Sequence, residues 1–207
     1  MLGSRIICEG KSFKTEGIVK YAEGHFIVVE TPFVEKIQLG QPLRCQIIEY
    51  QSSHSFQTTA VGKDNHHIIL TAPPEIRERW MITRESLRFP IDIKGKISAV
   101  SFSGKKPLVE LVKPYIVHIH DISEGGIGFS SSNYLREGSL AQIYFQLLDQ
   151  KVYLEMEIVQ SKYPTISRRF YYGGKFYDRS SPSYQVIRNY TIQAQLKRIM
   201  NREYGEG

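Results

Sequence analysis

Cysteine is scarce in this sequence, and long hydrophobic runs are missing. The chain of 207 residues contains two cysteines, Cys8 and Cys45, which are too few for a disulfide scaffold and fit a reducing compartment. No stretch approaches the ~18 consecutive apolar residues of a membrane span. The first residues show neither an apolar signal region nor a small-residue cleavage site. These absences predict a soluble cytoplasmic protein with no membrane span.

The composition is that of a folded protein, and its charge is unevenly spread. Hydrophobic residues make up 41% and charged residues 23%, which excludes a disordered or collagen-like chain. Residues 1–76 hold 7 Lys and Arg against 8 Asp and Glu, whereas residues 77–207 hold 20 against 13. An anionic partner is therefore expected in the C-terminal part, and a solvated basic surface is the plain alternative.

Short strands dominate the first part of the chain. Segments rich in β-branched and aromatic residues alternate with turn-forming residues, which predicts a small antiparallel barrel or sandwich. Pro73 and Pro74 then interrupt the pattern, because both favour an extended backbone and no helix across them. The predicted strands are Gly17–Tyr21, Phe26–Glu30, Leu43–Tyr50, Phe56–Gly62 and His67–Leu70.

A second set of strands follows and ends in a helix. Ser181 and Pro182 provide an N-cap and a first-turn proline for a helix over Tyr184–Arg202. The fold class is therefore predicted as all-β, with two small antiparallel β-barrels, residues 1–76 and 77–207, and a C-terminal α-helix. The predicted strands of the second part are Phe89–Val100, Leu108–Asp121, Gly128–Ser130, Leu140–Leu148, Val152–Tyr163 and Arg169–Tyr177.

The apolar stripe of the predicted helix shifts along its length. A shifting stripe fits a helix with one broad face buried within the protein. It also fits a helix whose first half packs on its own barrel and whose second half packs against something else. One face carries Val186, Ile187, Tyr190 and Ala194, and the other carries Ile192, Leu196, Ile199 and Met200.

Arginines gather directly after the predicted boundary between the two parts. Arg77, Arg79, Arg84 and Arg88 fall within 12 positions. On an extended or irregular loop, Arg84 and Arg88 could straddle a ligand with more than one phosphate. A guanidinium suits this task because its planar fork binds phosphate oxygens bidentately and its face stacks on bases. Taken alone, an arginine pair at this spacing is better explained as solvated loop residues.

A polar turn ends the predicted strand near residue 121. Asp121 can accept hydrogen bonds from the N1–H and N2–H₂ donors of a guanine edge, and Ser123 adds a short hydroxyl. Gly125 and Gly126 relieve the steric limit on positive φ and would let a ligand approach the backbone. The structural alternative is an Asx-type hairpin corner.

Together, the two elements resemble the PilZ family. The resemblance rests on RxxxR at Arg84–Arg88 and on DxSxxG at Asp121–Gly126, within a β-rich domain that ends in a helix. Gly173-Gly174-Lys175-Phe176 and the helical Ile187-Arg188-Asn189-Tyr190 also look like the end of that family's domain. The resemblance covers about residues 77–200.

The resemblance implies a six-stranded barrel that binds bis-(3′-5′)-cyclic dimeric GMP (cyclic di-GMP), with no catalysis, no metal and no other cofactor. Arg84 and Arg88 are expected to wrap the ligand and contact its phosphates and guanine. Asp121 and Ser123 are expected to contact a guanine. Gly125 and Gly126 complete the expected ligand site, Gly126 by shaping the turn.

One or two ligand molecules per site both fit the sequence. Many family members that bind a stacked ligand dimer carry an arginine directly before RxxxR, and Thr83 stands there in this chain.

The N-terminal half resembles the accessory barrel that precedes the PilZ domain in flagellar brake proteins. This implies a receptor in which the ligand binds at the domain junction and changes domain orientation, to regulate motility or surface attachment. The expected protein partner is a flagellar motor component, with recruitment to the flagellar base. The alternative is a regulator of exopolysaccharide synthesis that acts on the polysaccharide synthesis machinery.

An enzyme is the first competing interpretation. His118, His120 and Asp121 can be drawn as an HxHD metal site for zinc or iron. However, no further His or Cys motif at ligand spacing completes the set, and neither a Gly-rich phosphate loop with Lys-Ser/Thr nor a GxSxG elbow occurs. Histidines on a strand face are the better interpretation.

A barrel that binds single-stranded nucleic acid is the second competing interpretation. Tyr171-Tyr172 and Arg168-Arg169 could supply stacking and charge. Tyrosines in strands are more often core residues or cross-strand pairs, so no nucleic-acid polymer is expected as a partner.

Overall fold

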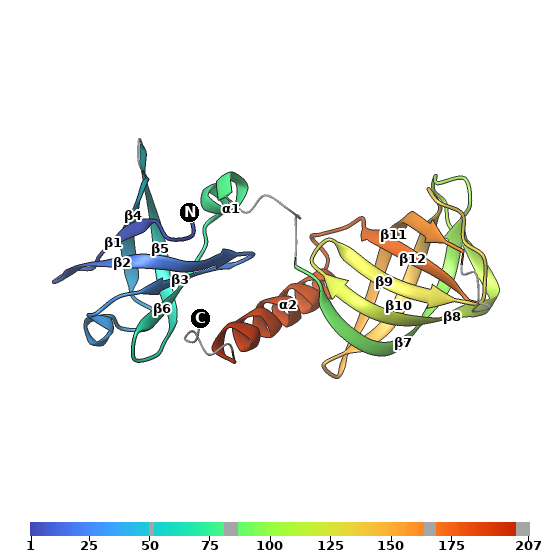
Figure 1. Ribbon diagram of the computed structural model, residues 1–207. Coiled ribbons are helices and arrows are strands. Elements are labelled where there is room, and N and C mark those ends of the chain that lie inside the picture. The colour runs from blue at the N-terminus through green and yellow to red at the C-terminus, as the bar shows by residue number, and fades with distance from the viewer. Residues whose placement is uncertain (50–51, 81–86, 164–168, 202–207) are drawn as a thin grey trace. The chain divides into compact units, whose positions relative to one another are not determined.

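The protein folds as two β-barrels, each followed by a helix (Figure 1). Both barrels are closed, and both consist of six antiparallel strands. This confirms the predicted all-β class with a C-terminal helix. The computed structural model describes residues 1–49, 52–80, 87–163 and 169–201.

The chain divides into two compact units, Met1–Glu85 and Ser86–Gly207. The predicted division into residues 1–76 and 77–207 stays a prediction. None of the helices in the described residues is both long enough and apolar enough to cross a membrane.

In the first barrel the strands run in the order β1-β2-β3-β6-β5-β4, and β1 pairs with β4 to close the sheet. The sequence predicted all of these strands except β1. A short 3₁₀ helix, η1 (Val34–Lys36), lies between β3 and β4. The strands are β1 (Arg5–Glu9), β2 (Lys14–Glu23), β3 (Phe26–Glu30), β4 (Pro42–Glu49), β5 (Ser52–Lys63) and β6 (His67–Thr71).

Helix α1 (Pro74–Trp80) follows the first barrel and was not predicted. Pro74 occupies the first helical position, where the missing N–H costs no helical hydrogen bond and the fixed φ suits the helix. The proline pair therefore ends the strand pattern and also starts a helix. Arg77 and Arg79 lie on this helix.

The second barrel contains six strands in the order β10-β11-β12-β9-β8-β7, and β10 pairs with β7 to close it. The sequence predicted all six as strand-sized segments. The strands are β7 (Phe89–Ser101), β8 (Val109–Ser123), β9 (Gly126–Ser131), β10 (Leu140–Leu147), β11 (Gln150–Lys162) and β12 (Phe170–Phe176).

Helix α2 (Pro182–Met200) begins as predicted. The Ser181 hydroxyl accepts a hydrogen bond from the Tyr184 amide at 3.2 Å, and Pro182 occupies the first turn. The helix packs on β11 and β8. The four residues of the first predicted face all pack in or against the core of the second barrel: Val186, Ile187, Tyr190 and Ala194.

Candidate functional site

The register of β7 and β8 brings Arg88 and the DxSxxG motif to one end of the second barrel. Phe89 pairs with Ile122 and Pro90 pairs with Asp121, so Arg88, directly before β7, lies beside the last residues of β8. A two-residue turn then connects β8 to β9. The second arginine of RxxxR and the DxSxxG turn are therefore neighbours. Arg84 lies outside the described residues.

Arg88 and Asp121 form an ion pair at the centre of this region. Nη1 of Arg88 is 3.6 Å from Oδ1 of Asp121, and the side chains are 55% and 31% exposed. Oδ1 is buried and accepts no hydrogen bond from any described residue. A buried carboxylate oxygen without a donor is costly, so this oxygen has unused capacity to accept a hydrogen bond.

Gly128 holds the Asp121 carboxylate in place, and the sequence analysis missed it. Gly128 pairs with Asp121 across β8 and β9. A Cβ at Gly128 would lie 2.8 Å from Cγ of Asp121, so the carboxylate occupies the space that a side chain would need. The available signal was the spacing of Gly126 and Gly128, because residues two apart on a strand share a face.

Ser123 and the turn glycines are tied into the barrel. Ser123 is 5% exposed, and its hydroxyl donates to the Gly126 carbonyl at 3.2 Å. The Gly125 carbonyl accepts from the Phe176 amide of β12 at 3.0 Å. A Cβ at Gly126 would collide with the Gly174 carbonyl, and the φ of Gly126 lies outside the left-handed region. Neither Gly125 nor Gly126 has a positive φ, so the conformational freedom expected of the two glycines is not used there. Gly126 is instead required by the close packing of β9 against β12.

The two histidines of the HxHD pattern share one face of β8, and Asp121 follows a register shift in the pairing of β8 with β9. Their rings stack with centroids 6.5 Å apart. Nε2 of His120 lies 2.9 Å from the Ser130 hydroxyl, and Nδ1 of His118 lies 3.8 Å from a carboxylate oxygen of Asp92. In the part of the chain that the structure describes, no three His, Cys, Asp or Glu side chains are close enough to hold a metal ion.

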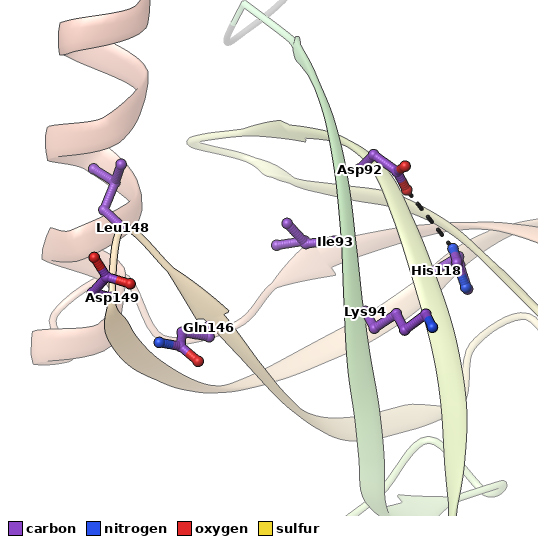
Figure 2. Close-up of a pocket in the computed structure, with 7 residues that line it drawn as sticks. All are labelled: Asp92, Ile93, Lys94, His118, Gln146, Leu148 and Asp149. Atoms are coloured by element: carbon purple, nitrogen blue, oxygen red, sulfur yellow. Dashed lines mark ion pairs between the residues drawn. The ribbon is translucent and has the colours of Figure 1, made fainter.

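His118 also lines a shallow polar depression on the outside of the barrel (Figure 2). Figure 2 shows His118 and Lys94 on one side of it and Gln146 and Asp149 on the other, with Ile93 pointing into the space between them. None of the residues that line the depression belongs to the RxxxR or DxSxxG motifs.

Of the two tyrosines that could stack on nucleic-acid bases, Tyr172 is buried and Tyr171 is exposed. Tyr172 is 4% exposed, donates from its hydroxyl to the Asn133 carbonyl at 3.0 Å and accepts from the Leu135 amide at 2.9 Å. This burial raises the pKa of Tyr172 and keeps its ring from a base. Tyr171 is 46% exposed. Arg168 lies outside the described residues.

The fold and the site define a class: a closed six-stranded barrel with a C-terminal helix, an arginine before its first strand and an aspartate-serine-glycine turn beside it. The family model described as the PilZ domain matches residues 82–193, which is more than half of the chain. The chain belongs to the PilZ domain family.

Several solved structures resemble the chain over most of its length. The Bacillus subtilis inhibitor of motility, MotI/DgrA, is 14% identical with a TM-score of 0.46, covering 98% of this chain and 100% of that one. K. pneumonia MrkH with c-di-GMP is 15% identical with a TM-score of 0.44, covering 97% and 90%. Escherichia coli YcgR with c-di-GMP is 11% identical with a TM-score of 0.43, covering 96% and 86%. No curated protein matches the chain.

Proposed function

We propose that this PilZ-family protein is a cyclic di-GMP receptor that acts as an effector and not as an enzyme. One observation carries the proposal. The β7–β8 register brings Arg88, the second arginine of RxxxR, to within 3.6 Å of Asp121, the first residue of DxSxxG. The Asp121 carboxylate keeps a buried oxygen that no described residue satisfies.

The proposed roles follow from the chemistry of each group. Arg84 and Arg88 bind the ligand phosphates, because a guanidinium donates two parallel hydrogen bonds to phosphate oxygens. Asp121 accepts from the N1–H and N2–H₂ groups of a guanine, since an ionised carboxylate is an acceptor only. The Ser123 oxygen, which donates its own proton to Gly126, keeps lone pairs for a ligand donor. Gly125 and Gly126 form the turn that holds these groups.

Isothermal titration tests the proposal. The purified protein should bind cyclic di-GMP and should bind cyclic di-AMP far more weakly, because adenine lacks the two guanine donors that Asp121 would accept. Prolonged incubation should leave cyclic di-GMP intact when it is followed by chromatography. Equal affinity for the two dinucleotides, or no binding of cyclic di-GMP, contradicts the receptor. Turnover of the ligand would restore the enzyme interpretation.

The proposed output is a change in domain orientation. Arg84 belongs to the segment between α1 and β7, which joins the two units of the chain. A ligand that Arg84, Arg88 and Asp121 bind together would favour the arrangements that let all three reach it. The protein would act in the cytoplasm, and its change in domain orientation would regulate motility or surface attachment. Its proposed partner is a flagellar motor component, and the polysaccharide synthesis machinery is the alternative.

A further inference from the structure

Three neighbouring strands of the second barrel, β7, β10 and β11, carry basic and aromatic side chains on their outer surface. Ile97, Phe145 and Leu154 of these strands belong to the core, so their neighbours in each strand face outward. The register shift between β7 and β10 falls beyond these positions, and the pairing here is regular. The outward residues form two adjacent rows, which we call the lysine–tyrosine face: Lys96, Tyr144 and Tyr153, then Lys94, Gln146 and Lys151.

The three lysines of this face have no acidic partner in the chain. Lys94, Lys96 and Lys151 are exposed, and none makes an ion pair with a described residue. The nearby carboxylates lie elsewhere: Glu155 is 2.8 Å from Lys106, and Asp149 lies across the depression from Lys94 (Figure 2). The lysine–tyrosine face therefore carries three unpaired positive charges.

The outer surface of the first barrel is arranged differently. Lys20 of β2 lies 2.8 Å from a carboxylate oxygen of Glu30 on β3, and Arg5 of β1 pairs with Glu16 of β2. Basic side chains on that barrel are thus balanced by cross-strand acidic partners. On the lysine–tyrosine face the neighbouring positions are tyrosine and glutamine instead, so an acidic partner would have to come from another molecule.

Two tyrosines lie among these lysines and pack against each other. The rings of Tyr144 and Tyr153 have centroids 4.6 Å apart, and Tyr153 is 55% exposed. Exposed tyrosine is enriched where proteins bind proteins, because one ring supplies both apolar area and a hydroxyl. Since each ring already contacts the other, the pair forms one apolar unit and not a series of separate platforms for bases. None of the six residues is a large aliphatic side chain suited to insertion into a bilayer.

We propose that the lysine–tyrosine face binds an acidic segment of a partner protein. Carboxylates of the segment pair with Lys94, Lys96 and Lys151, and an apolar or aromatic side chain packs on the two tyrosines. Residues two apart on a strand are about 7 Å apart, and β7 and β11 are separated by about 10 Å, so the segment needs acidic residues spread over that span. The inference goes beyond the proposed function, because none of the six residues belongs to the RxxxR or DxSxxG motifs.

A soluble random copolymer of glutamate and tyrosine is the probe, and biolayer interferometry at low salt measures its binding. The parent should bind it. The triple variant Lys94→Ala, Lys96→Ala, Lys151→Ala should lose at least about fivefold in affinity, since each exposed ion pair contributes only modestly. Tyr153→Ser should also lose about fivefold, because it removes the apolar contact and keeps all three charges. If the triple variant does not fold, Lys96→Ala alone decides by the same comparison.

A matched triple variant, Lys105→Ala, Arg136→Ala, Lys197→Ala, removes the same net charge from exposed positions outside β7, β10 and β11. It should bind the copolymer as the parent does. An equal loss in both triple variants, or no binding by the parent, overturns the inference. Tighter binding of oligothymidylate or phosphatidylglycerol vesicles through the same lysines also overturns it, because the partner would then be a nucleic acid or a membrane. All variants should bind cyclic di-GMP as the parent does, so the proposed function stands or fails separately.

Discussion

Three strands converge on the carboxylate of Asp121. Arg88 approaches it from the start of β7, Asp121 itself ends β8, and Gly128 of β9 leaves the space that the carboxylate fills. The aspartate is therefore positioned before any ligand arrives, which lowers the entropy cost of binding. Because the site is preorganised, replacing a single residue in it should weaken ligand binding strongly.

Arg88→Ala should weaken cyclic di-GMP binding by at least about tenfold, because an arginine that makes charge-assisted hydrogen bonds contributes on the order of 1.5–3 kcal/mol. Arg88→Lys should fall between this variant and the parent, since a lysine keeps the charge and loses the planar fork. Titration calorimetry measures both. Arg136→Ala, an exposed arginine between β9 and β10, is the control and should bind normally. Parent affinity in Arg88→Ala would show that the site is assigned wrongly.

At the scale of elements, the pairing of β1 with β4 closes the first barrel, and two cysteines face each other across these strands. Cys8 and Cys45 are cross-strand partners, 1% and 0% exposed, with their sulfurs 3.3 Å apart. The sequence alone did not predict that the two cysteines meet. The hydrogen bond with Cys8, together with burial, raises the pKa of the Cys45 thiol above its usual value.

Cys45 should therefore resist alkylation in the folded protein. A raised pKa means that the thiol stays protonated at pH values where a free cysteine already forms thiolate, and the thiolate is the reactive form. At pH 8, iodoacetamide should label Cys45 slowly in native protein and rapidly in urea, as followed by mass spectrometry of the peptide that contains Cys45 after digestion of the parent protein. Equal rates in the two conditions would contradict the buried, hydrogen-bonded thiol.

At the scale of the whole molecule, the net charge belongs to one unit. Residues 1–85 contain 10 basic and 10 acidic side chains, whereas residues 86–207 contain 17 and 11. The surplus therefore lies in the unit that carries the proposed site, where it would attract an anionic dinucleotide and raise its association rate at low salt.

Small-angle scattering should detect the proposed change in domain orientation. Saturating cyclic di-GMP should alter the scattering curve of the parent, because the ligand favours the arrangements in which Arg84 and Arg88 both reach it. Arg88→Ala, at a ligand concentration that saturates the parent and leaves the variant mostly unbound, should scatter like the ligand-free parent. Superimposable parent curves with and without ligand, at a saturation verified by calorimetry, would rule out the switch and leave the binding site intact.

Much of the fold follows from local patterns in the sequence. Strand-sized segments predicted the six strands of the second barrel, and Ser181 with Pro182 predicted the start of α2, because both signals depend on neighbouring residues. Helix α1 was missed because a proline pair was interpreted only as a break. Strand β1 was missed as well.

The sequence by itself determined the strand content, the RxxxR and DxSxxG motifs and the family that they indicate. Only the tertiary structure decided that Arg88 meets Asp121 and that Gly128 makes room for the carboxylate. The physical reason is that these relations depend on the register between strands. Register is a property of two strands paired with each other, set by the turn that joins them and by the barrel that they close, so the residues of one strand alone do not specify it.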